Sequence, residues 1–290
     1  MFTRRQFMVV STLGAAGLPL RRGIAEAVAD SQVEFGVCAS VSKAALLKQA
    51  GFGYVEEGVS GFLMPKATDE EFKKKHGEAG MPPLPVRACN GFIPSDMKVV
   101  GPSVDLDSVA KYIGKVFARA EEAGVTRIVF GSGGARRIPE GFPREKAIEQ
   151  IVELGKRIAP LAEPRGVTVA VEPLNRKECN FINRVDECLA VVDAVGRPNF
   201  MQHADVFHMM REDEGPESLI KAGARLVHCH VATKQNRKAP GLEETDFRPY
   251  FKALKQIGYK GGISIEGGWK DFAADLPRAF RELKNQWDSA

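Results

Sequence analysis

Side chains that bind metal ions recur at regular intervals in the second half of the sequence. Each one ends an apolar run typical of a buried strand: Glu172 in VAVEPLN, Asp205 in QHADVFH, His230 in VHCHVAT and Glu266 in ISIEGGW. Successive members are 33, 25 and 36 residues apart, which is about one strand–helix unit each. Three carboxylates packed into an apolar setting would repel one another and lose their hydration unless a cation offset both costs. The spacing therefore predicts a divalent metal site.

The ligand types indicate which ion such a site would hold. Oxygen ligands with one imidazole suit Mn²⁺, Mg²⁺ or Co²⁺ better than a thiolate-bound structural Zn²⁺, although zinc is also compatible with this set. Residues two apart in a strand share a face, so His228 points the same way as His230, one layer deeper. We group His228 with the substrate-binding residues, as a support for the ligand or its neighbour. His203 shares a face with Asp205 and fits either the site wall or the core.

Eight strands that alternate with amphipathic helices would position these residues. Six times the chain runs from a helical segment through a glycine into an apolar strand, and two more strands are predicted near 33–40 and 84–92. The glycines fit left-handed helix caps. Count and length predict an α/β fold, a single-domain (β/α)₈ TIM barrel, whose active site lies at the C-terminal ends of the strands. A doubly wound sheet is the alternative, but the first strand lacks the G-x-G-x-x-G turn of a dinucleotide fold.

Two of the predicted helices show their patterns clearly. In the segment REKAIEQIVELGKRIAPLAE, apolar residues from Ile148 to Leu161 recur at helical spacing and trace one face. Another helix is expected to begin near Asp105 and Asp107, which suit an N-terminal cap.

The first residues have the pattern of a twin-arginine export signal. The sequence begins with Thr3-Arg4-Arg5-Gln6-Phe7, continues through a moderately apolar run and reaches the small-residue stretch AEAVA. We therefore assign residues 1–29 to an export signal, residues 30–290 to the barrel, and the mature protein to the periplasm. The apolar run is too short to span a bilayer, and a retained basic helix is the alternative.

Charge and cysteine content exclude several classes of protein. Once residues 1–29 are set aside, 37 basic and 36 acidic residues remain, which argues against a nucleic-acid or membrane-surface partner. The five cysteines form no C-x-x-C pair, and we interpret them as mostly buried free thiols. The outer helices could mediate formation of a homo-oligomer, but nothing in their pattern fixes it.

The four-part pattern resembles the xylose-isomerase-like TIM barrels of sugar isomerases and epimerases, most closely the ketose 3-epimerase and hydroxypyruvate isomerase branch. The matching pieces are EPLNRKE at 172–178, DVFHM at 205–209, HCHVA at 228–232 and the IE that ends strand eight. The resemblance implies that Glu172, Asp205, His230 and Glu266 hold one divalent metal. It also implies that Glu178, His208 and an arginine after strand seven contact substrate oxygens.

Two departures from the family pattern concern the substrate pocket. The family arginine follows the ligand histidine by six residues, where this chain has Asn236, so Arg237 is the nearest equivalent. After strand eight, EGGW places small glycines and Trp269 where bulkier residues are expected. We place Asn90, Glu57 and Trp269 in the pocket wall, which the loops EGVSGFLMPKATDEEF and FIPSDMKVVGPS are expected to shape.

The expected reaction is proton transfer beside a sugar carbonyl. A metal would act as a Lewis acid and stabilise the enediolate, while one of Glu172 and Glu266 removes a proton and the other supplies one. The same groups could instead expel the carbon 1 substituent of a 3-keto-glycoside, which would make the protein a lyase. Arg136 and Arg137 fit an anionic substrate or a solvated loop equally well.

Two other classes remain as alternatives. Endonuclease-type repair enzymes share this barrel but need several metals and more than five histidines, and a fold alone does not establish turnover. A non-catalytic exported sugar-binding protein would bind metal without exchanging a proton on any sugar.

Overall fold

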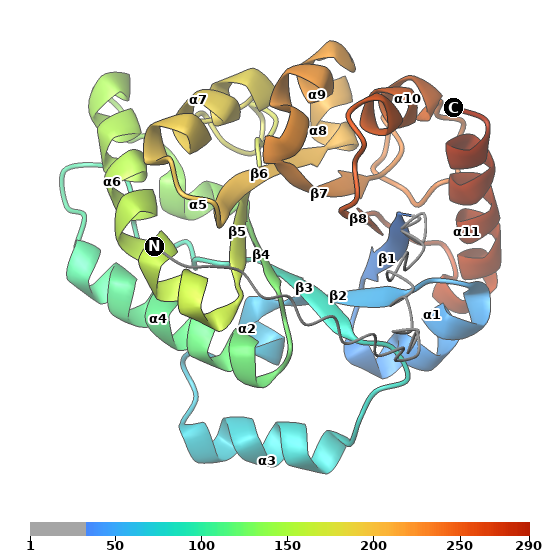
Figure 1. Cartoon of the computed structure of the whole chain (residues 1–290), viewed down its shortest axis with the longest axis horizontal. Helices are drawn as coiled ribbons and strands as arrows, with labels where there is room; N and C mark the ends of the chain where they lie inside the picture. Colours follow the sequence, from blue (N-terminus) through green and yellow to red (C-terminus); the bar gives the residue numbers. More distant parts are fainter. Residues whose placement is uncertain (1–32) are drawn as a thin grey trace, which may run out of the picture. The chain divides into compact units, whose positions relative to one another are not determined.

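The chain forms the predicted closed barrel. The computed structural model describes residues 33–290. Its strands are parallel, each pairs with its neighbours along the chain, and the last returns to the first (Figure 1). The strands are β1 (Glu34–Cys38), β2 (Tyr54–Gly58), β3 (Val86–Asn90), β4 (Arg127–Phe130), β5 (Thr168–Val171), β6 (Phe200–Asp205), β7 (Leu226–Val231) and β8 (Gly262–Ile265). The (β/α)₈ prediction is confirmed, whereas the predicted export signal lies outside the described residues.

Helices cover the outside of the barrel, and none within residues 33–290 is both long and apolar enough to cross a membrane. They are α1 (Ala44–Ala50), α2 (Val59–Phe62), α3 (Asp69–Ala79), α4 (Leu106–Glu122), α5 (Gly133–Arg136), α6 (Arg144–Ala162), α7 (Val185–Val195), α8 (Val206–Arg211), α9 (Glu217–Ala222), α10 (Arg248–Gln256) and α11 (Phe272–Asp288). Within residues 33–290, three short 3₁₀ turns lie between a helix and a strand: η1 (Val41–Lys43), η2 (Glu163–Arg165) and η3 (Gly223–Arg225).

Helix caps and apolar faces explain where these elements begin and end. The Asp105 side chain accepts hydrogen bonds from the first backbone N–H groups of α4, as predicted. Gly51 and Gly196 end α1 and α7 in the left-handed conformation, with φ of 105° and 63°. The buried face of α6 centres on Ile151, Leu154 and Ile158. Ile148 and Leu161, predicted on that face, lie at its margins and are 39% exposed, so this part of the prediction was wrong.

The segment after β2 is more regular than the expected pocket loop. It contains α2 and α3, and α3 stands outside the ring of helices that covers the barrel (Figure 1). Thr68 begins α3 with a capping box to Glu71. His76 of α3, which its charged surroundings mark as a surface residue, is half-buried. Its ring packs against Phe62 and Phe72 at centroid distances of 4.7 and 4.3 Å.

The cysteines match their predicted state. All five are unpaired thiols in the described structure, and four of them are buried. Cys38 is the exception, because it ends β1 beside the barrel mouth and is only partly covered.

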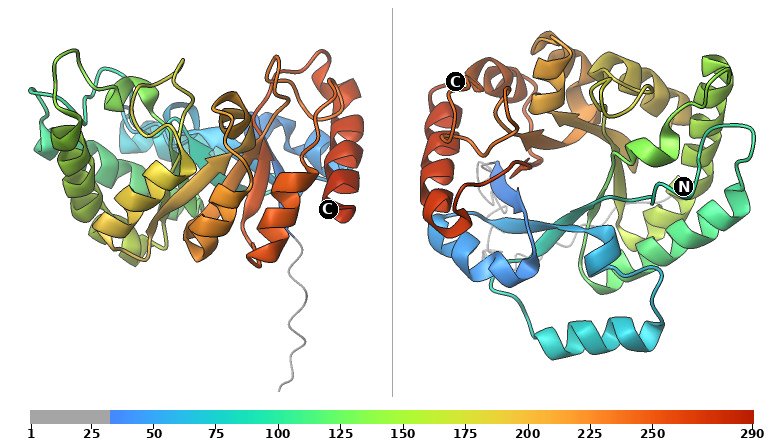
Figure 2. Two further views of the ribbon diagram at one scale, coloured as in Figure 1. Left: turned by 90° about the horizontal axis from the view of Figure 1, so that it is seen from above. Right: turned by 180° about the vertical axis from the view of Figure 1, so that it is seen from behind.

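Loops that follow the strands gather at one end of the barrel (Figure 2). Register carries the side chains of neighbouring strands to the same height: Asp205 pairs with His230, and His230 pairs with Ser264. Side chains that end successive strands therefore meet at this end, where enzymes of this fold place their active sites.

Candidate metal centre

The structure brings together the four residues that were predicted to hold a metal. One oxygen or nitrogen atom from each of Glu172, Asp205, His230 and Glu266 lies within 4.8 Å of the others. Nδ1 of His230 lies 3.5 Å from Oε1 of Glu172 and 3.4 Å from Oε2 of Glu266. Three of the four side chains are buried, and that of Glu266 is 27% exposed. The cluster is therefore open to solvent on the Glu266 side.

Local structure fixes how the carboxylates enter the cluster. Asp205 caps α8, because its Oδ1 accepts a hydrogen bond of 2.7 Å from the backbone N–H of Phe207, and Oδ2 is left for the centre. Glu172 passes close to Gly131, where an added Cβ would lie 2.3 Å from Oε2. Glycine at position 131 therefore makes room for the Glu172 carboxylate.

Unpartnered atoms show that the cluster suits a cation. Within the described residues, Oε1 of Glu172 and Nδ1 of His230 are buried and have no hydrogen-bond partner. Buried polar atoms seldom stay unpaired, and a carboxylate oxygen and an imidazole nitrogen are both metal-ligating atoms. The donor set and these two atoms fit a divalent ion.

Glu56 completes the cluster from below and was missed in the sequence. Its Oε1 lies 2.9 Å from Nε2 of His230, and its Oε2 lies 2.7 Å from both Nε2 of His228 and Oγ of Ser264. Since Nε2 of His230 is engaged by Glu56, Nδ1 is the nitrogen that faces the other ligands. This matches the common arrangement in which a carboxylate orients a metal-binding histidine.

Glu57, which we expected in the pocket wall, points elsewhere. Its Oε1 accepts a hydrogen bond of 2.5 Å from the backbone N–H of Val41, at the start of η1. Neighbouring strand residues face opposite sides, and the inner position belongs to Glu56. The expectation for Glu57 was wrong because YVEEGV contains two adjacent glutamates and the sequence does not show which of them faces inward.

Burial and close contacts shift the acid–base properties of this group. Burial would raise the pKa of Glu56, but His230 and His228 outweigh it and hold that pKa well below its ordinary value. Burial raises the pKa of Glu172. For Glu266 the effect of burial is outweighed by His230 and Arg237, so its pKa is lowered. The two glutamates proposed as proton carriers therefore stand in electrostatically different surroundings.

His228 supports Glu56 below the cluster, as expected of a support, and its full burial argues against the direct substrate contact with which it was grouped. Its ring is fully buried, and its Nε2 is bonded to Glu56 beneath His230. His203 belongs to the core as well: it is fully buried, and its ring packs edge-on against that of His230 at 4.2 Å between centroids.

His208 and Glu178 stand beside the cluster, as the family resemblance implies. Nε2 of His208 lies 3.6 Å from Oδ2 of Asp205 and 3.9 Å from Oε2 of Glu178. This nitrogen is buried and has no hydrogen-bond partner among the described residues. Asn175, which we did not single out in EPLNRKE, contacts both side chains.

Arg237, rather than Asn236, reaches the cluster. Its guanidinium pairs with Glu266, with Asp205 at 3.4 Å and with Glu178 at 3.2 Å. It also lies over the Phe207 ring, 4.8 Å from the centroid. The left-handed backbone of Arg237, with φ of 52°, turns it into the site.

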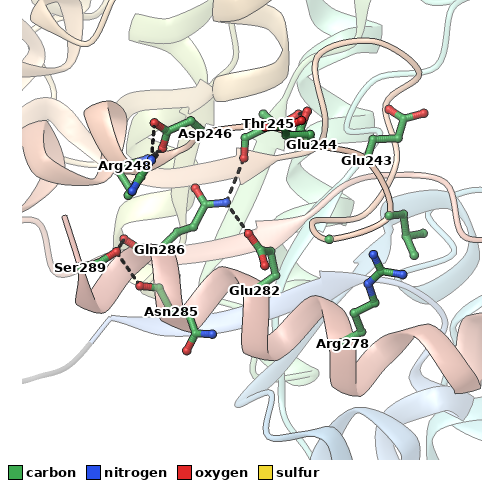
Figure 3. A pocket seen from close by; sticks show the side chains of 12 residues that line it. Glu243, Glu244, Thr245, Asp246, Arg248, Arg278, Glu282, Asn285, Gln286 and Ser289 are labelled. Carbon is green, nitrogen blue, oxygen red and sulfur yellow. Dashed lines mark hydrogen bonds and ion pairs between the residues drawn. The ribbon is translucent and has the colours of Figure 1, made fainter.

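Glu243 stabilises the loop that carries Arg237. Its carboxylate accepts hydrogen bonds of 2.6 Å from both Thr233 Oγ1 and Asn236 Nδ2. Glu243 lines one edge of a polar cavity of about 570 Å³ between this loop and α11 (Figure 3). Gln286 in the same cavity donates to the Thr245 carbonyl and to Glu282. The contact between Gln286 and Thr245 fastens the loop to α11.

The remaining wall residues differ in their contacts. Asn90 Nδ2 donates to Oε1 of Glu266 at 3.3 Å, so Asn90 does reach the site. Trp269 is half-buried, and its ring packs edge-on against that of Phe272, 5.0 Å between centroids.

The two arginines after β4 differ, because Arg136 is buried whereas Arg137 is exposed. Arg136 is fully buried, and its Nη2 donates to the backbone carbonyl of Glu172 at 2.5 Å. Arg137 donates to the backbone carbonyl of Glu178 at 2.6 Å. Arg136 thus holds the end of β5 and does not lie in a solvated loop.

Comparison with known proteins agrees with this geometry. A family model described as a xylose isomerase-like TIM barrel matches residues 44–286. The chain therefore belongs to this family, and the resemblance found in its motifs is confirmed.

Proteins similar to this chain include sugar 3-epimerases. An L-ribulose 3-epimerase of Methylomonas sp. (strain DH-1) is 28% identical over 220 residues, which cover 75% of this chain and 74% of that protein. The crystal structure of a D-allulose 3-epimerase from Methylomonas sp. in complex with D-allulose has 26% identity and a TM-score of 0.73, covering 88% of this chain and 97% of that one. The crystal structure of the IOLI protein with a bound zinc atom shares the fold at 17% identity, with a TM-score of 0.64 and coverage of 88% and 96%.

Proposed function

We propose that the protein is a divalent-metal-dependent sugar epimerase that inverts carbon 3 of a free ketose. The observation that carries this proposal is the meeting of Glu172, Asp205, His230 and Glu266, with unpartnered buried atoms on Glu172 and His230. The 3-epimerases among its relatives give the reaction class.

The four residues would hold the ion, and Glu56 would orient His230 for it. When bound, a divalent cation would supply positive charge beside the substrate carbonyl and so stabilise the enediolate that forms on loss of a proton. Mn²⁺, Mg²⁺ or Co²⁺ is the expected ion, and zinc is compatible with the same donors.

The chain's own residues would move the proton and bind the sugar. One of Glu172 and Glu266 takes the proton from carbon 3, and the other delivers one to the opposite face. His208, Glu178 and Arg237 bind the neighbouring oxygens, since all three border the cluster. The residues that bind the sugar and the glutamates that move the proton would then act on neighbouring atoms of the same substrate.

An uncharged ketose fits the site better than a sugar phosphate. Arg237 already faces three carboxylates, whereas Arg136 and Arg137 are bonded to backbone carbonyls. Arg136 and Arg237 therefore already have partners, which favours an uncharged substrate over a phosphate beside them.

The test is product analysis on a panel of substrates. Mn²⁺-loaded protein is incubated with L-ribulose, D-allulose, their phosphates and 3-keto-glycosides, and the products are separated chromatographically. We expect the C3 epimer of at least one free ketose, and none from a Glu172→Gln variant. Aglycone release alone would favour a lyase, which the relatives do not support. Metal binding without any product would instead indicate a non-catalytic sugar-binding protein.

We also propose export by the twin-arginine route. The support is the Thr3–Phe7 motif with the apolar run and AEAVA stretch that follow it. A protein exported in the folded state can take up its metal before it leaves the cytoplasm, which suits a buried centre.

A further inference from the structure

Asn175 lies between His208 and Glu178, two of the side chains that border the metal cluster. It is 4% exposed and occupies the loop between β5 and α7. Its Nδ2 atom is 2.7 Å from Nδ1 of His208 and 3.0 Å from Oε1 of Glu178. Both N–H groups of the amide therefore have a partner.

The backbone fixes which way the Asn175 amide points. Its Oδ1 accepts hydrogen bonds from the backbone N–H groups of Lys177 and Glu178, at 3.1 and 3.3 Å. A backbone N–H can donate only to the amide oxygen, so the nitrogen and oxygen cannot be exchanged. The group that faces His208 is therefore an N–H donor.

A donor at this position determines which nitrogen of the neutral His208 ring carries the proton. Nδ1 must accept the hydrogen bond from Asn175, so in the neutral ring the proton lies on Nε2. Nε2 is the atom that lies near Asp205 and Glu178 and has no partner in the described structure.

From this geometry we infer that Asn175 is a positioning residue that holds His208 as the Nε2–H tautomer, so that His208 donates a hydrogen bond to a substrate oxygen. The substrate's oxygen must then accept, as a carbonyl, hydroxyl or developing alkoxide does. The part of this inference that concerns turnover rests on the proposed function, whereas the tautomer does not. Within the described residues Asn175 makes no hydrogen bond to the metal cluster, so its effect on catalysis passes through His208 and Glu178.

The tautomer can be measured directly because the chain has only five histidines. The full chain is labelled with ¹⁵N-histidine, loaded with diamagnetic Mg²⁺ and observed by long-range ¹H–¹⁵N NMR, in which the unprotonated ring nitrogen resonates far downfield of the protonated one. A His208→Gln variant identifies the His208 signals. We expect protonated Nε2 and unprotonated Nδ1 in the unmodified protein. Protonated Nδ1 would overturn the inference, whether or not any variant folds.

An Asn175→Asp variant tests the cause. Aspartate keeps the acceptor for the loop N–H groups but offers no donor, so we expect the His208 proton to move to Nδ1. Asn183→Asp is the matched control, because Asn183 is equally buried in the same loop but donates only to the backbone carbonyls of Leu174 and Cys179. We expect this control to keep the Nε2–H signal. An unchanged tautomer in Asn175→Asp would contradict the assigned role.

Kinetics separate this inference from the proposed function. With L-ribulose or D-allulose as substrate, Asn175→Asp should lower kcat/KM by about 10- to 100-fold, because His208 would lose its hydrogen bond to the substrate oxygen, while Mn²⁺ affinity measured by calorimetry stays unchanged. Full activity with a shifted tautomer would overturn the role in turnover. If the unmodified protein turns over no sugar, the proposed function fails, and the NMR result still decides the tautomer.

Discussion

Nε2 of His230 lies 2.9 Å from Oε1 of Glu56, which leaves Nδ1 as the nitrogen that faces Glu172 and Glu266. This contact explains why His228 and His230 face the same way in β7, because Glu56 binds both. The barrel therefore contains a connected group of polar side chains around His230. The Glu56 carboxylate lies below this histidine, and the other three metal-cluster carboxylates lie above it.

Replacing Glu56 should weaken metal binding without touching a ligand. An uncharged glutamine amide cannot accept hydrogen bonds from both histidines as the Glu56 carboxylate does. We therefore expect the Mn²⁺ affinity of Glu56→Gln to fall about 10- to 100-fold. Isothermal titration calorimetry measures this fall. Glu57→Gln is the matched control, since Glu57 faces the N–H of Val41. Equal affinities in the two variants would contradict the role of Glu56.

Adding one methyl group at Gly131 should displace Glu172. The new Cβ would lie 2.3 Å from Oε2, closer than any non-bonded contact allows, so the carboxylate must move. We expect Gly131→Ala to lose metal affinity and turnover together while its circular dichroism stays native. Gly61→Ala serves for comparison, because a Cβ there meets nothing within 4 Å. If Gly131→Ala bound metal normally, the position of Glu172 would be wrong.

The two proposed proton carriers should each be essential. Glu172→Gln and Glu266→Gln should reduce epimerisation to background, because an amide cannot exchange a proton with carbon 3. Glu244→Gln, in the exposed loop after β7, should keep full activity. Turnover of more than a few per cent in either site variant would remove that glutamate from the mechanism.

Metal should stabilise the folded chain through His230. An ion that binds only the native state at a hundred times its Kd raises the free energy of unfolding by about 2.7 kcal/mol. Urea unfolding with Mn²⁺ and with EDTA should show this difference. His230→Asn should abolish most of it, and a response that survives in this variant would place the ion elsewhere.

The export signal can be tested in cells. Arg4→Lys combined with Arg5→Lys keeps the charge but removes the twin-arginine pattern, so the protein should stay in the cytoplasm. Fractionation with immunoblotting measures the distribution, and the single substitution Arg21→Lys should have no effect. Periplasmic protein in the double variant would exclude this route.

The fold and the four-residue cluster could be predicted from the sequence because both follow from regular periods. Strand alternation shows which residues face inward, and one strand–helix unit separates Glu172, Asp205, His230 and Glu266. Because these periods repeat around the whole barrel, the meeting of the four side chains could be inferred without coordinates.

These periods could not predict contacts that depend on loop conformation or on a choice between two adjacent residues of the same type. Glu56 and Glu57 differ only by one step of alternation, and only the packed barrel shows which one faces His230. Arg237 replaces Asn236 in the site because its backbone adopts a left-handed turn that no period predicts. Arg136 was expected either to bind an anion or to lie in a solvated loop, yet it is buried beneath the end of β5.

Hydrogen exchange at carbon 3 tests the proposed reaction most directly. Mn²⁺-loaded protein is incubated in D₂O with D-allulose and L-ribulose, the metal is then removed, and the sugars are analysed by NMR. We predict deuterium at carbon 3 together with the new epimer, and neither after prior treatment with EDTA. Epimer formed without deuterium, or exchange that does not depend on metal, would contradict a metal-assisted proton transfer at this site.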